Sequence, residues 1–300
     1  MKVLFLVGGD RQIASARLRA WQLADQWSDA MVKIYGREKW ADIPVDVLIV
    51  NKLCPVMSPE LFANWRTEGK RIIWDCCDPV WWWRSKQEIM AYLRQVDAVV
   101  VSNHGLKEDF EEEFQRPAEV ILDRLPPQTT QRQHQAVDRP VIVWFGYGQN
   151  RVPTLLGSLL ALQRLTVEGI PYTLRIIDDG PPAWPGLTEN ILQHVEFVKF
   201  DHERLHEELC RCDVALLPPY PGAWGAMKSN NKEFAAAWAG LPISDGDYHG
   251  LVRYLESQTV REAEGALMRE WAQEHGDIRQ SVKEWQVCCR AVLEASCSVS

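Results

Sequence analysis

Short apolar runs alternate with helix-like stretches along this chain, and this alternation constrains the fold more than any other feature. In the first half the apolar runs cover residues 3–7, 45–50, 71–74 and 98–101, and they are typical of strands buried on both faces. Residues 14–27, 58–69, 86–95 and 106–114 predict helices that follow these strands. Strands that alternate with helices form a parallel α/β sheet, and ligands bind at the carboxyl ends of its strands.

The same alternation restarts after a polar segment. Residues 126–140 contain three prolines and several glutamines without apolar periodicity, which is typical of a linker. Further strands are expected at residues 141–145, 172–177, 195–197 and 214–217. We therefore predict an N-terminal domain over residues 1–126, a linker over 127–140, a C-terminal domain over 141–277 and a last helix over 278–300.

Composition and charge narrow the class of protein. The 300 residues carry a net charge of −8, which weighs against a nucleic-acid partner, although a local basic cleft would suffice for one. The eight cysteines include no CxxC pair, so we expect reduced thiols, a cytoplasmic protein and no metal site. No apolar stretch reaches 18 residues, and no membrane span is expected. The sequence does not indicate an oligomeric state.

A polar loop between a strand and an alanine-rich helix predicts an anion site. The loop Lys228-Ser229-Asn230-Asn231-Lys232 follows the expected strand at residues 214–217, and the helix ends at Gly240-Leu-Pro. Backbone N–H groups at a helix N-terminus, together with lysines, favour a phosphate or diphosphate. Asn230 and Asn231 would bind phosphate or sugar hydroxyls, or serve as turn and N-cap residues.

These segments resemble the GT-B glycosyltransferases, and family 4 in particular. The resemblance is carried by residues 141–146 (VIVWFG), 212–218 (CDVALLP), the loop 228–232 with Gly240-Leu-Pro, and in the first half by residues 15–19 (SARLR) and 71–79 (RIIWDCCDP). It implies two Rossmann-like domains that face each other across a cleft, with the last helix packed back on the N-terminal domain. It also implies a metal-independent transfer, with retention of configuration, from a UDP-, GDP-, ADP- or TDP-sugar to a hydroxyl acceptor.

One departure from the family pattern concerns the donor ribose. Family members carry two glutamates eight positions apart around this loop, and the second holds the ribose hydroxyls. Aligned on Gly240, these positions are Met227 and Ala235, neither of which accepts such hydrogen bonds. Glu233 lies nearby, but two residues rotate a side chain by about 200° around a helix. Either the ribose is held otherwise, the donor is unusual, or activity has been lost.

Candidate site residues follow from the resemblance and from the strand ends. Lys228 and Lys232 would stabilise the leaving diphosphate, while Asp75, Asp78 and His104 would line the acceptor side. The exposed face of Trp81, Trp82 or Trp83 could stack on a sugar ring, because the three cannot all point inward. The remaining candidates for donor binding are Gly8, Gly9, Arg17, Gly146, Tyr147, Arg151, Ser229, Asn231 and Glu233.

Three other functions remain open. A non-catalytic nucleotide- or sugar-binding protein on the same scaffold is favoured by Met227 and Ala235. A non-hydrolysing nucleotide-sugar epimerase shares the two-domain plan but would need a set of carboxylates that the sequence does not reveal. A glycosyltransferase that acts on nucleic acid, as some phage enzymes do, would need a local basic cleft.

Overall fold

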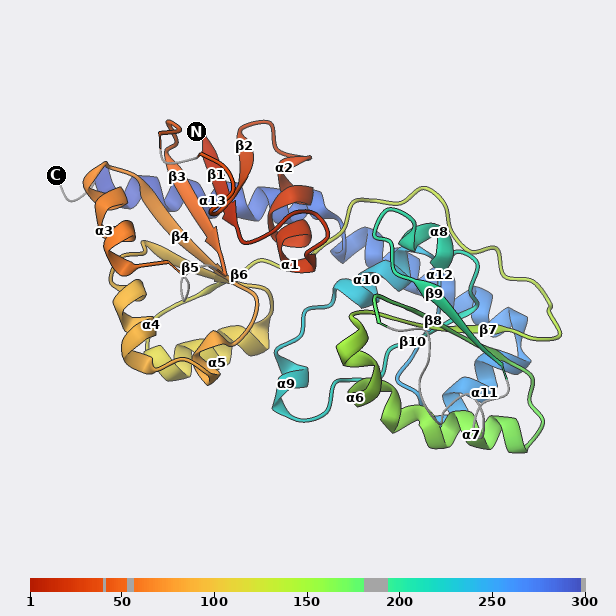
Figure 1. The fold of residues 1–300 in the computed structure, drawn as a ribbon. Coiled ribbons are helices and arrows are strands. Elements are labelled where there is room, and N and C mark those ends of the chain that lie inside the picture. Colours follow the sequence, from red (N-terminus) through yellow and green to blue (C-terminus); the bar gives the residue numbers. More distant parts are fainter. Residues whose placement is uncertain (40–41, 53–56, 181–193, 298–300) are drawn as a thin grey trace. The chain divides into compact units, whose positions relative to one another are not determined.

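The computed structural model describes residues 1–39, 42–52, 57–180 and 194–297 (Figure 1). The chain divides into two compact units. Unit 1 comprises residues 1–126, 226–230 and 277–300, and unit 2 comprises residues 127–225 and 231–276. The loop predicted to bind an anion is therefore divided, with Lys228, Ser229 and Asn230 in unit 1 and Asn231 and Lys232 in unit 2.

Unit 1 is built on a six-stranded sheet in the order β2-β1-β3-β4-β5-β6, and every pairing in it is parallel. The register sets Asn51 beside Asp75 and Cys76 beside Val101, so β3, β4 and β5 end at the same edge. The strands are β1 (Val3–Val7), β2 (Ala30–Ile34), β3 (Val47–Asn51), β4 (Arg71–Cys76), β5 (Ala98–Val101) and β6 (Glu119–Val120).

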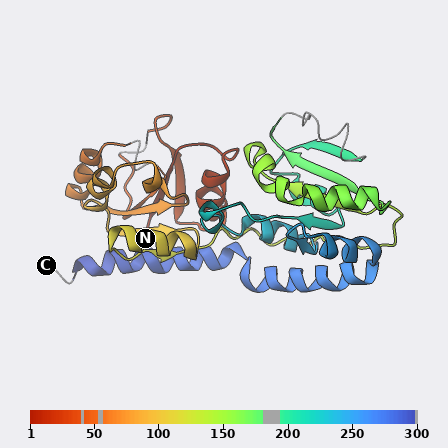
Figure 2. The same ribbon diagram turned by 90° about the horizontal axis from the view of Figure 1, so that it is seen from below.

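Helices cover both faces of this sheet and bury two hydrophobic clusters. The last helix, α13, packs along unit 1 (Figure 2). The rings of Trp285 and Phe5 lie 5.8 Å apart between centroids. This is the return of the last helix that the resemblance implied. The helical elements are α1 (Ala14–Ala16), η1 (Arg17–Trp21), α2 (Gln22–Ala24), α3 (Pro59–Thr67), η2 (Val80–Trp82), α4 (Lys86–Leu93), α5 (His104–Phe114) and α13 (Ile278–Cys297).

Unit 2 has a five-stranded parallel sheet in the order β11-β10-β7-β8-β9. Its core is one cluster of apolar side chains from the central strands and from α7 and α11. The strands are β7 (Val141–Phe145), β8 (Thr173–Asp178), β9 (Val195–Lys199), β10 (Val214–Leu216) and β11 (Ile243–Ser244). The helical elements are η3 (Gly148–Asn150), α6 (Arg151–Leu155), η4 (Leu156–Ser158), α7 (Leu159–Val167), α8 (Leu205–Leu209), α9 (Ala223–Ala226), α10 (Asn231–Trp238), α11 (Tyr248–Glu256) and α12 (Gln258–His275).

The segment expected to be a linker packs against unit 2. Arg132 donates to Asp213 at 2.8 Å, and its own N–H donates to the Ala239 carbonyl at 2.8 Å. Arg269 donates to the carbonyls of Gln128 and Thr130 at 2.7 and 3.0 Å. Residues 128–132 are thus held to unit 2 by hydrogen bonds, and their backbone carbonyls find partners there.

Further differences from the sequence-based expectations concern elements, among them α9 and β11, which were not expected. The helix expected over residues 14–27 contains a π-helical segment, η1, and ends at Ala24. The strand β2 and the helix α11 were not expected. Within the described ranges, every helix is too short or too polar to cross a lipid bilayer.

Candidate functional site

The end of β4 holds two aspartates with contrasting surroundings. Asp75 is the last but one residue of the strand and has no exposed surface, whereas Asp78 follows the strand and is partly exposed. Sequence analysis placed both on the acceptor side. The structure separates them into a buried network and an accessible cluster.

Asp75 belongs to the buried network around Arg19. The guanidinium of Arg19, on η1, contacts Asp75 Oδ1 at 2.5 Å and Asp123 Oδ1 at 2.9 Å, and Asn51 donates to Asp75 Oδ2 at 2.7 Å. Burial raises the pKa of Asp75, although Arg19 and Asn51 oppose this shift. Burial alone would lower the pKa of Arg19, but the two aspartates raise it. Because Asp75 is sealed beneath the surface, we assign it to folding and remove it from the proposed catalytic set.

Asp78 lies between two lysines of unit 1. Lys52, the residue after β3, forms an ion pair with Asp78 Oδ2, and Lys228 Nζ lies 4.0 Å from Asp78 Oδ1. Burial lowers the pKa of Lys228, and the positive charge of Lys52 lowers it further, while Asp78 opposes both. The cluster carries one more positive than negative charge and lies at the ligand-binding edge of the sheet. Lys52 was missed because no motif marks it; its place directly after a buried strand was the available signal.

Lys228 reaches this cluster because the preceding residues are anchored in unit 1. Asn103 caps α5 by accepting from Leu106 N–H at 2.8 Å, and its Nδ2 donates to the Met227 carbonyl at 3.0 Å. Met227 itself lies in the core beside α5. A Cβ at Gly105 would lie 2.2 Å from the Ala226 carbonyl oxygen, so this approach requires glycine. The methionine at the usual glutamate position thus serves as an apolar anchor.

His104 is the first residue of α5 and is exposed. It follows β5, at the same edge of the sheet as Asp78. Its neighbours in the chain fix the loop anchor, so the imidazole is presented next to that anchor. This position suits a hydrogen-bonding group on the acceptor side.

The first loop of unit 1 is held by Arg17. Its Nη1 donates to the Arg11 carbonyl at 2.8 Å and approaches the Gln12 carbonyl at 3.4 Å, and burial lowers its pKa. The Gly9 carbonyl accepts from the Trp21 indole at 3.3 Å, while Gly8 is exposed. Arg17 therefore shapes the loop in which Gly8 and Gly9 lie.

In unit 2, the end of β7 accommodates Lys232. Its ammonium lies 5.3 Å from the Trp144 ring centroid, a cation–π distance. A Cβ on Gly146, whose φ is +154°, would be 2.8 Å from Lys232 Nζ, so the glycine leaves room for the ammonium. Tyr147 is exposed beside it. Lys232 and Asn231 are in the first turn of α10, and Asn230 and Ser229 precede that helix.

Arg151 is buried and takes part in a buried ion pair. Its Nε lies 2.7 Å from Asp178 Oδ2, and its guanidinium packs over the Phe197 ring at 5.5 Å. Burial raises the pKa of Asp178, against the charge of Arg151. The pair joins α6 to the end of β8. Arg151 thus supports the loop around Gly146, and we propose no direct ligand contact for it.

Glu233 has the least compensated carboxylate in this part of the chain. Its Oε2 is buried without a hydrogen-bond partner among the described residues, and burial raises its pKa. Ala235, at the position of the usual second glutamate, is packed into unit 2. The first turn of α10 therefore does contain a carboxylate, although not at the position that the family uses.

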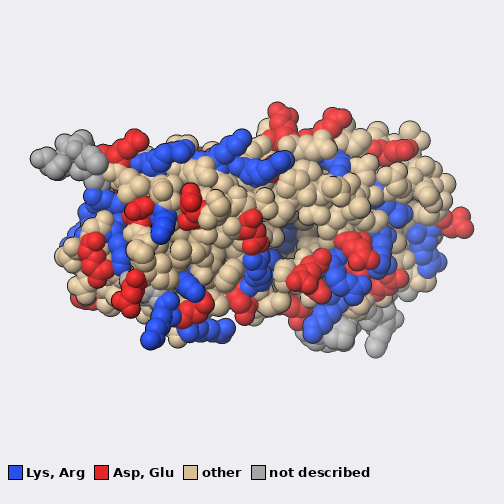
Figure 3. Space-filling view, turned by 90° about the horizontal axis from the view of Figure 1, so that it is seen from above, with Lys and Arg blue, Asp and Glu red and all other residues tan. Residues whose placement is uncertain are grey.

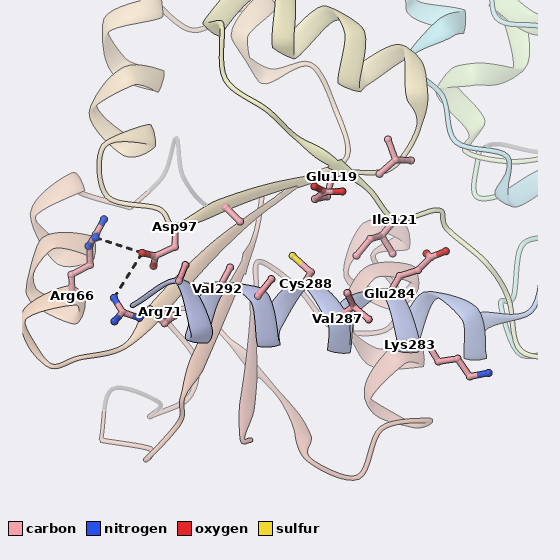
Figure 4. A pocket seen from close by; sticks show the side chains of 14 residues that line it. Arg66, Arg71, Asp97, Glu119, Ile121, Lys283, Glu284, Val287, Cys288 and Val292 are labelled. Carbon is pink, nitrogen blue, oxygen red and sulfur yellow. Dashed lines mark ion pairs between the residues drawn. The ribbon is translucent and has the colours of Figure 1, made fainter. Parts of the chain in front are cut away.

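Two further surface features lie outside this cluster of residues. A hollow of about 1050 Å³ lies in unit 1 between α13 and the edge of the sheet (Figure 4). Arg71 and Ala98, which line it, begin β4 and β5, so it lies at the amino ends of these strands, away from Asp78.

On the face drawn in Figure 3, basic and acidic side chains are interspersed. Among the described residues, no group of three or more His, Cys, Asp or Glu side chains is arranged to hold a metal ion.

Comparison with known proteins identifies the fold. No protein-family model and no curated sequence matches the chain. HepE of Anabaena, in complex with UDP and glucose, matches with a TM-score of 0.65 and 11% identity over 96% of this chain and 99% of that one. An alpha-glucosyltransferase in complex with UDP and a 13-mer DNA matches with a TM-score of 0.66 and 8% identity over 96% and 99%.

A third structure agrees with these two. The lipopolysaccharide outer core galactosyltransferase WaaB matches with a TM-score of 0.57 and 13% identity over 95% and 98% of the two chains. Identities this low establish the fold alone. The two Rossmann-like units and the three full-length matches show that this chain has the GT-B glycosyltransferase fold.

Proposed function

We propose that this protein transfers a glycosyl group from a nucleoside diphosphate sugar to a hydroxyl acceptor. The observation that carries the proposal is the position of Lys232, which enters the space left by Gly146 at the carboxyl end of β7 and lies in the first turn of α10. A fixed cation beside helix N–H groups suits a diphosphate. HepE and the alpha-glucosyltransferase were solved with UDP, which makes UDP the first donor nucleotide to test.

The proposed chemistry is a retaining, metal-independent transfer. The bond from the anomeric carbon to the donor phosphate breaks, a bond to the acceptor oxygen forms on the same face, and the acceptor proton passes to the departing phosphate oxygen. Lys232 and Lys228 stabilise the negative charge that builds on the diphosphate. Asp78 positions Lys52 and Lys228, and His104 binds the acceptor.

We further propose that Glu233 takes the place of the missing ribose-binding glutamate. Met227 and Ala235 are committed to packing, whereas Glu233 places a carboxylate in the first turn of α10. If the nucleotide is bound without sugar transfer, the non-catalytic binding protein becomes the correct function. That alternative is favoured because Met227 and Ala235, which stand at the two usual glutamate positions, are apolar and buried.

The test begins with thermal shifts. UDP, GDP, ADP and TDP are added to the whole protein in EDTA and then in Mg²⁺, and one of them should raise Tm by several degrees, because a ligand that binds only the folded state stabilises it. Lys232→Ala should abolish the shift. Lys199→Ala, which removes the exposed lysine that ends the edge strand β9, is the matched control and should retain the shift.

The rate of sugar release then distinguishes a glycosyltransferase from a non-catalytic binding protein. Release of UDP from UDP-glucose, with and without saccharide acceptors, should fall at least 100-fold in Lys232→Ala and in Lys228→Ala while Tm stays near that of the wild type. Wild-type rates in both variants would refute the assignment of the lysines. A nucleotide shift without any sugar release would favour the binding protein.

A further inference from the structure

Three consecutive tryptophans follow Asp78 and diverge in direction. Trp81 points inward, with its ring 5.4 Å from that of Phe110 and 5.9 Å from that of Phe114. Trp82 and Trp83 are 42% and 55% exposed. Two indoles at the surface, within five residues of Asp78 along the chain, form a large exposed apolar area in the segment that follows β4.

A single carboxylate fixes the orientation of this segment. Asp109 Oδ2, on α5, accepts from Trp81 Nε1 at 2.5 Å and from Trp82 Nε1 at 2.9 Å. The polar edge of the Trp82 ring is thereby satisfied, while 42% of the residue stays exposed. A ring held in this way loses little conformational entropy when a ligand stacks on it.

Polar side chains lie one helical turn further along α5. A hollow of about 450 Å³ in unit 1 is lined by Lys86, Gln87, Glu113 and Gln115, together with Met90, Arg94 and Phe114. Lys86 Nζ bridges the Glu113 carbonyl at 2.5 Å and the Glu113 carboxylate at 3.0 Å. Asp109 and Glu113 are one turn apart on α5, so the Trp81 and Trp82 indoles that bond Asp109 lie one helical turn from Glu113, which lines the hollow.

We propose that Trp82, Trp83 and this hollow form a saccharide-binding subsite for the acceptor. A pyranose has an apolar face that matches an indole, and its equatorial hydroxyls suit the amides and charged groups of the hollow. This inference rests on the proposed function, and it names the acceptor class as a glycan. Base stacking on the same rings would require cations for the phosphates, but Lys86 is paired with Glu113, and Arg84 lies 3.9 Å from Glu88.

The experiment measures saccharide binding by the whole protein. Maltohexaose, cellohexaose and chitohexaose are titrated by isothermal calorimetry against the wild type, Trp82→Ala/Trp83→Ala, Trp83→Phe and Val287→Ala. Val287 is 60% exposed on α13 and controls for loss of exposed apolar surface in the same unit. At least one saccharide should bind, the double variant should bind it at least tenfold more weakly, and Trp83→Phe should stay within threefold of the wild type.

Two outcomes would overturn the inference: no binding of any of the three saccharides, or equal binding by the wild type and the double variant. A tryptophan-dependent affinity for a 13-mer duplex DNA that exceeds the affinity for every saccharide would also overturn it. The UDP thermal shift should be the same in the double variant, whose Tm confirms folding. Saccharide binding without any nucleotide shift would contradict the proposed function and leave the subsite standing, so the two failures are distinguishable.

Discussion

Asp75 and Asp78 are three residues apart, yet they belong to two kinds of electrostatic environment. Asp75 pairs with Arg19 where neither side chain has more than 2% of its surface exposed, and Asp123 and Asn51 complete the network. Asp78 pairs with lysines whose side chains remain about one-third exposed. The first arrangement holds η1 and β4 together. The second keeps positive charge available to a ligand, which is what a binding site requires.

The largest expected effect tests the buried network. Asp75→Ala leaves the Arg19 guanidinium partly uncompensated in the core, which costs about 3–5 kcal/mol. Urea unfolding should show this loss, whereas Asp78→Ala should cost less than about 1 kcal/mol because its partners stay hydrated. Equal losses in the two variants would remove the distinction between the two aspartates.

The next effect tests the change from buried to accessible side chains between Met227 and Lys228. Met227 packs in the core of unit 1, whereas Lys228 belongs to the accessible cluster around Asp78. Met227→Glu restores a glutamate at the usual family position but places its carboxylate in the core beside α5. We expect a loss of about 3 kcal/mol. Met227→Leu conserves volume and should cost less than about 1.5 kcal/mol. A stable Met227→Glu protein with stronger nucleotide binding would show that the anchor is dispensable.

A smaller effect concerns Glu233 in unit 2. Unlike the carboxylates of Asp75 and Asp78, it has a buried oxygen without a hydrogen-bond partner among the described residues. Its folded-state pKa is raised by burial, so the folded protein binds the proton more tightly than the unfolded chain. The charged form therefore destabilises the fold at neutral pH, and this penalty disappears as pH falls through the folded and then the unfolded pKa. Glu233→Gln should raise Tm by about 2–4 °C at pH 8, corresponding to about 1 kcal/mol.

That increment should shrink as pH falls and vanish near pH 3, where the glutamate is protonated in the unfolded chain as well as in the folded protein. Glu262→Gln, an exposed site on α12, is the matched control and should leave Tm unchanged throughout. A Glu233→Gln increment that is independent of pH would assign the effect to packing instead of charge.

The smallest effect is the coupling inside the exposed cluster. Lys52→Met removes a positive charge that lowers the pKa of Lys228, so the pKa of Lys228 should rise toward its ordinary value. NMR titration of ¹³C-labelled lysine Cε would measure the shift, with an expected change in folding stability below about 1 kcal/mol. Lys33→Met, on β2, is the control. A fall in the pKa of Lys228 would mean that Lys52 acts mainly by holding Asp78 in position beside Lys228.

The sequence predicted the fold class because buried parallel strands have a strong signature, and most strands and helices lie near their expected positions. It missed β2 because this edge strand is only half-buried and contains Lys33. It missed α11 because Asp245-Gly-Asp and Gly250 are typical of a turn, whereas Asp247 caps the helix by accepting from Gly250 N–H at 3.0 Å.

The candidate site was less predictable for a physical reason. Asp75 and Asp78 have the same local signature, a carboxylate at the end of a buried strand, and they are distinguished by distant partners such as Arg19, 56 positions before Asp75. No sequence motif marks Lys52. Contacts across the sheet decide which polar group is sealed and which is available, and those contacts have no signature in a single sequence.

The position of α13 has a consequence for how the chain folds as it is synthesised. The core around Phe5 is closed by Ile278, Trp285 and Cys289, although unit 1 begins with the first strand. At about 5–20 residues per second, the ribosome needs roughly 10–30 s after the first 126 residues to deliver α13. We expect the second unit to complete its own core while the first still exposes an apolar sheet face, so the part of the protein made first would be the last to reach its native state.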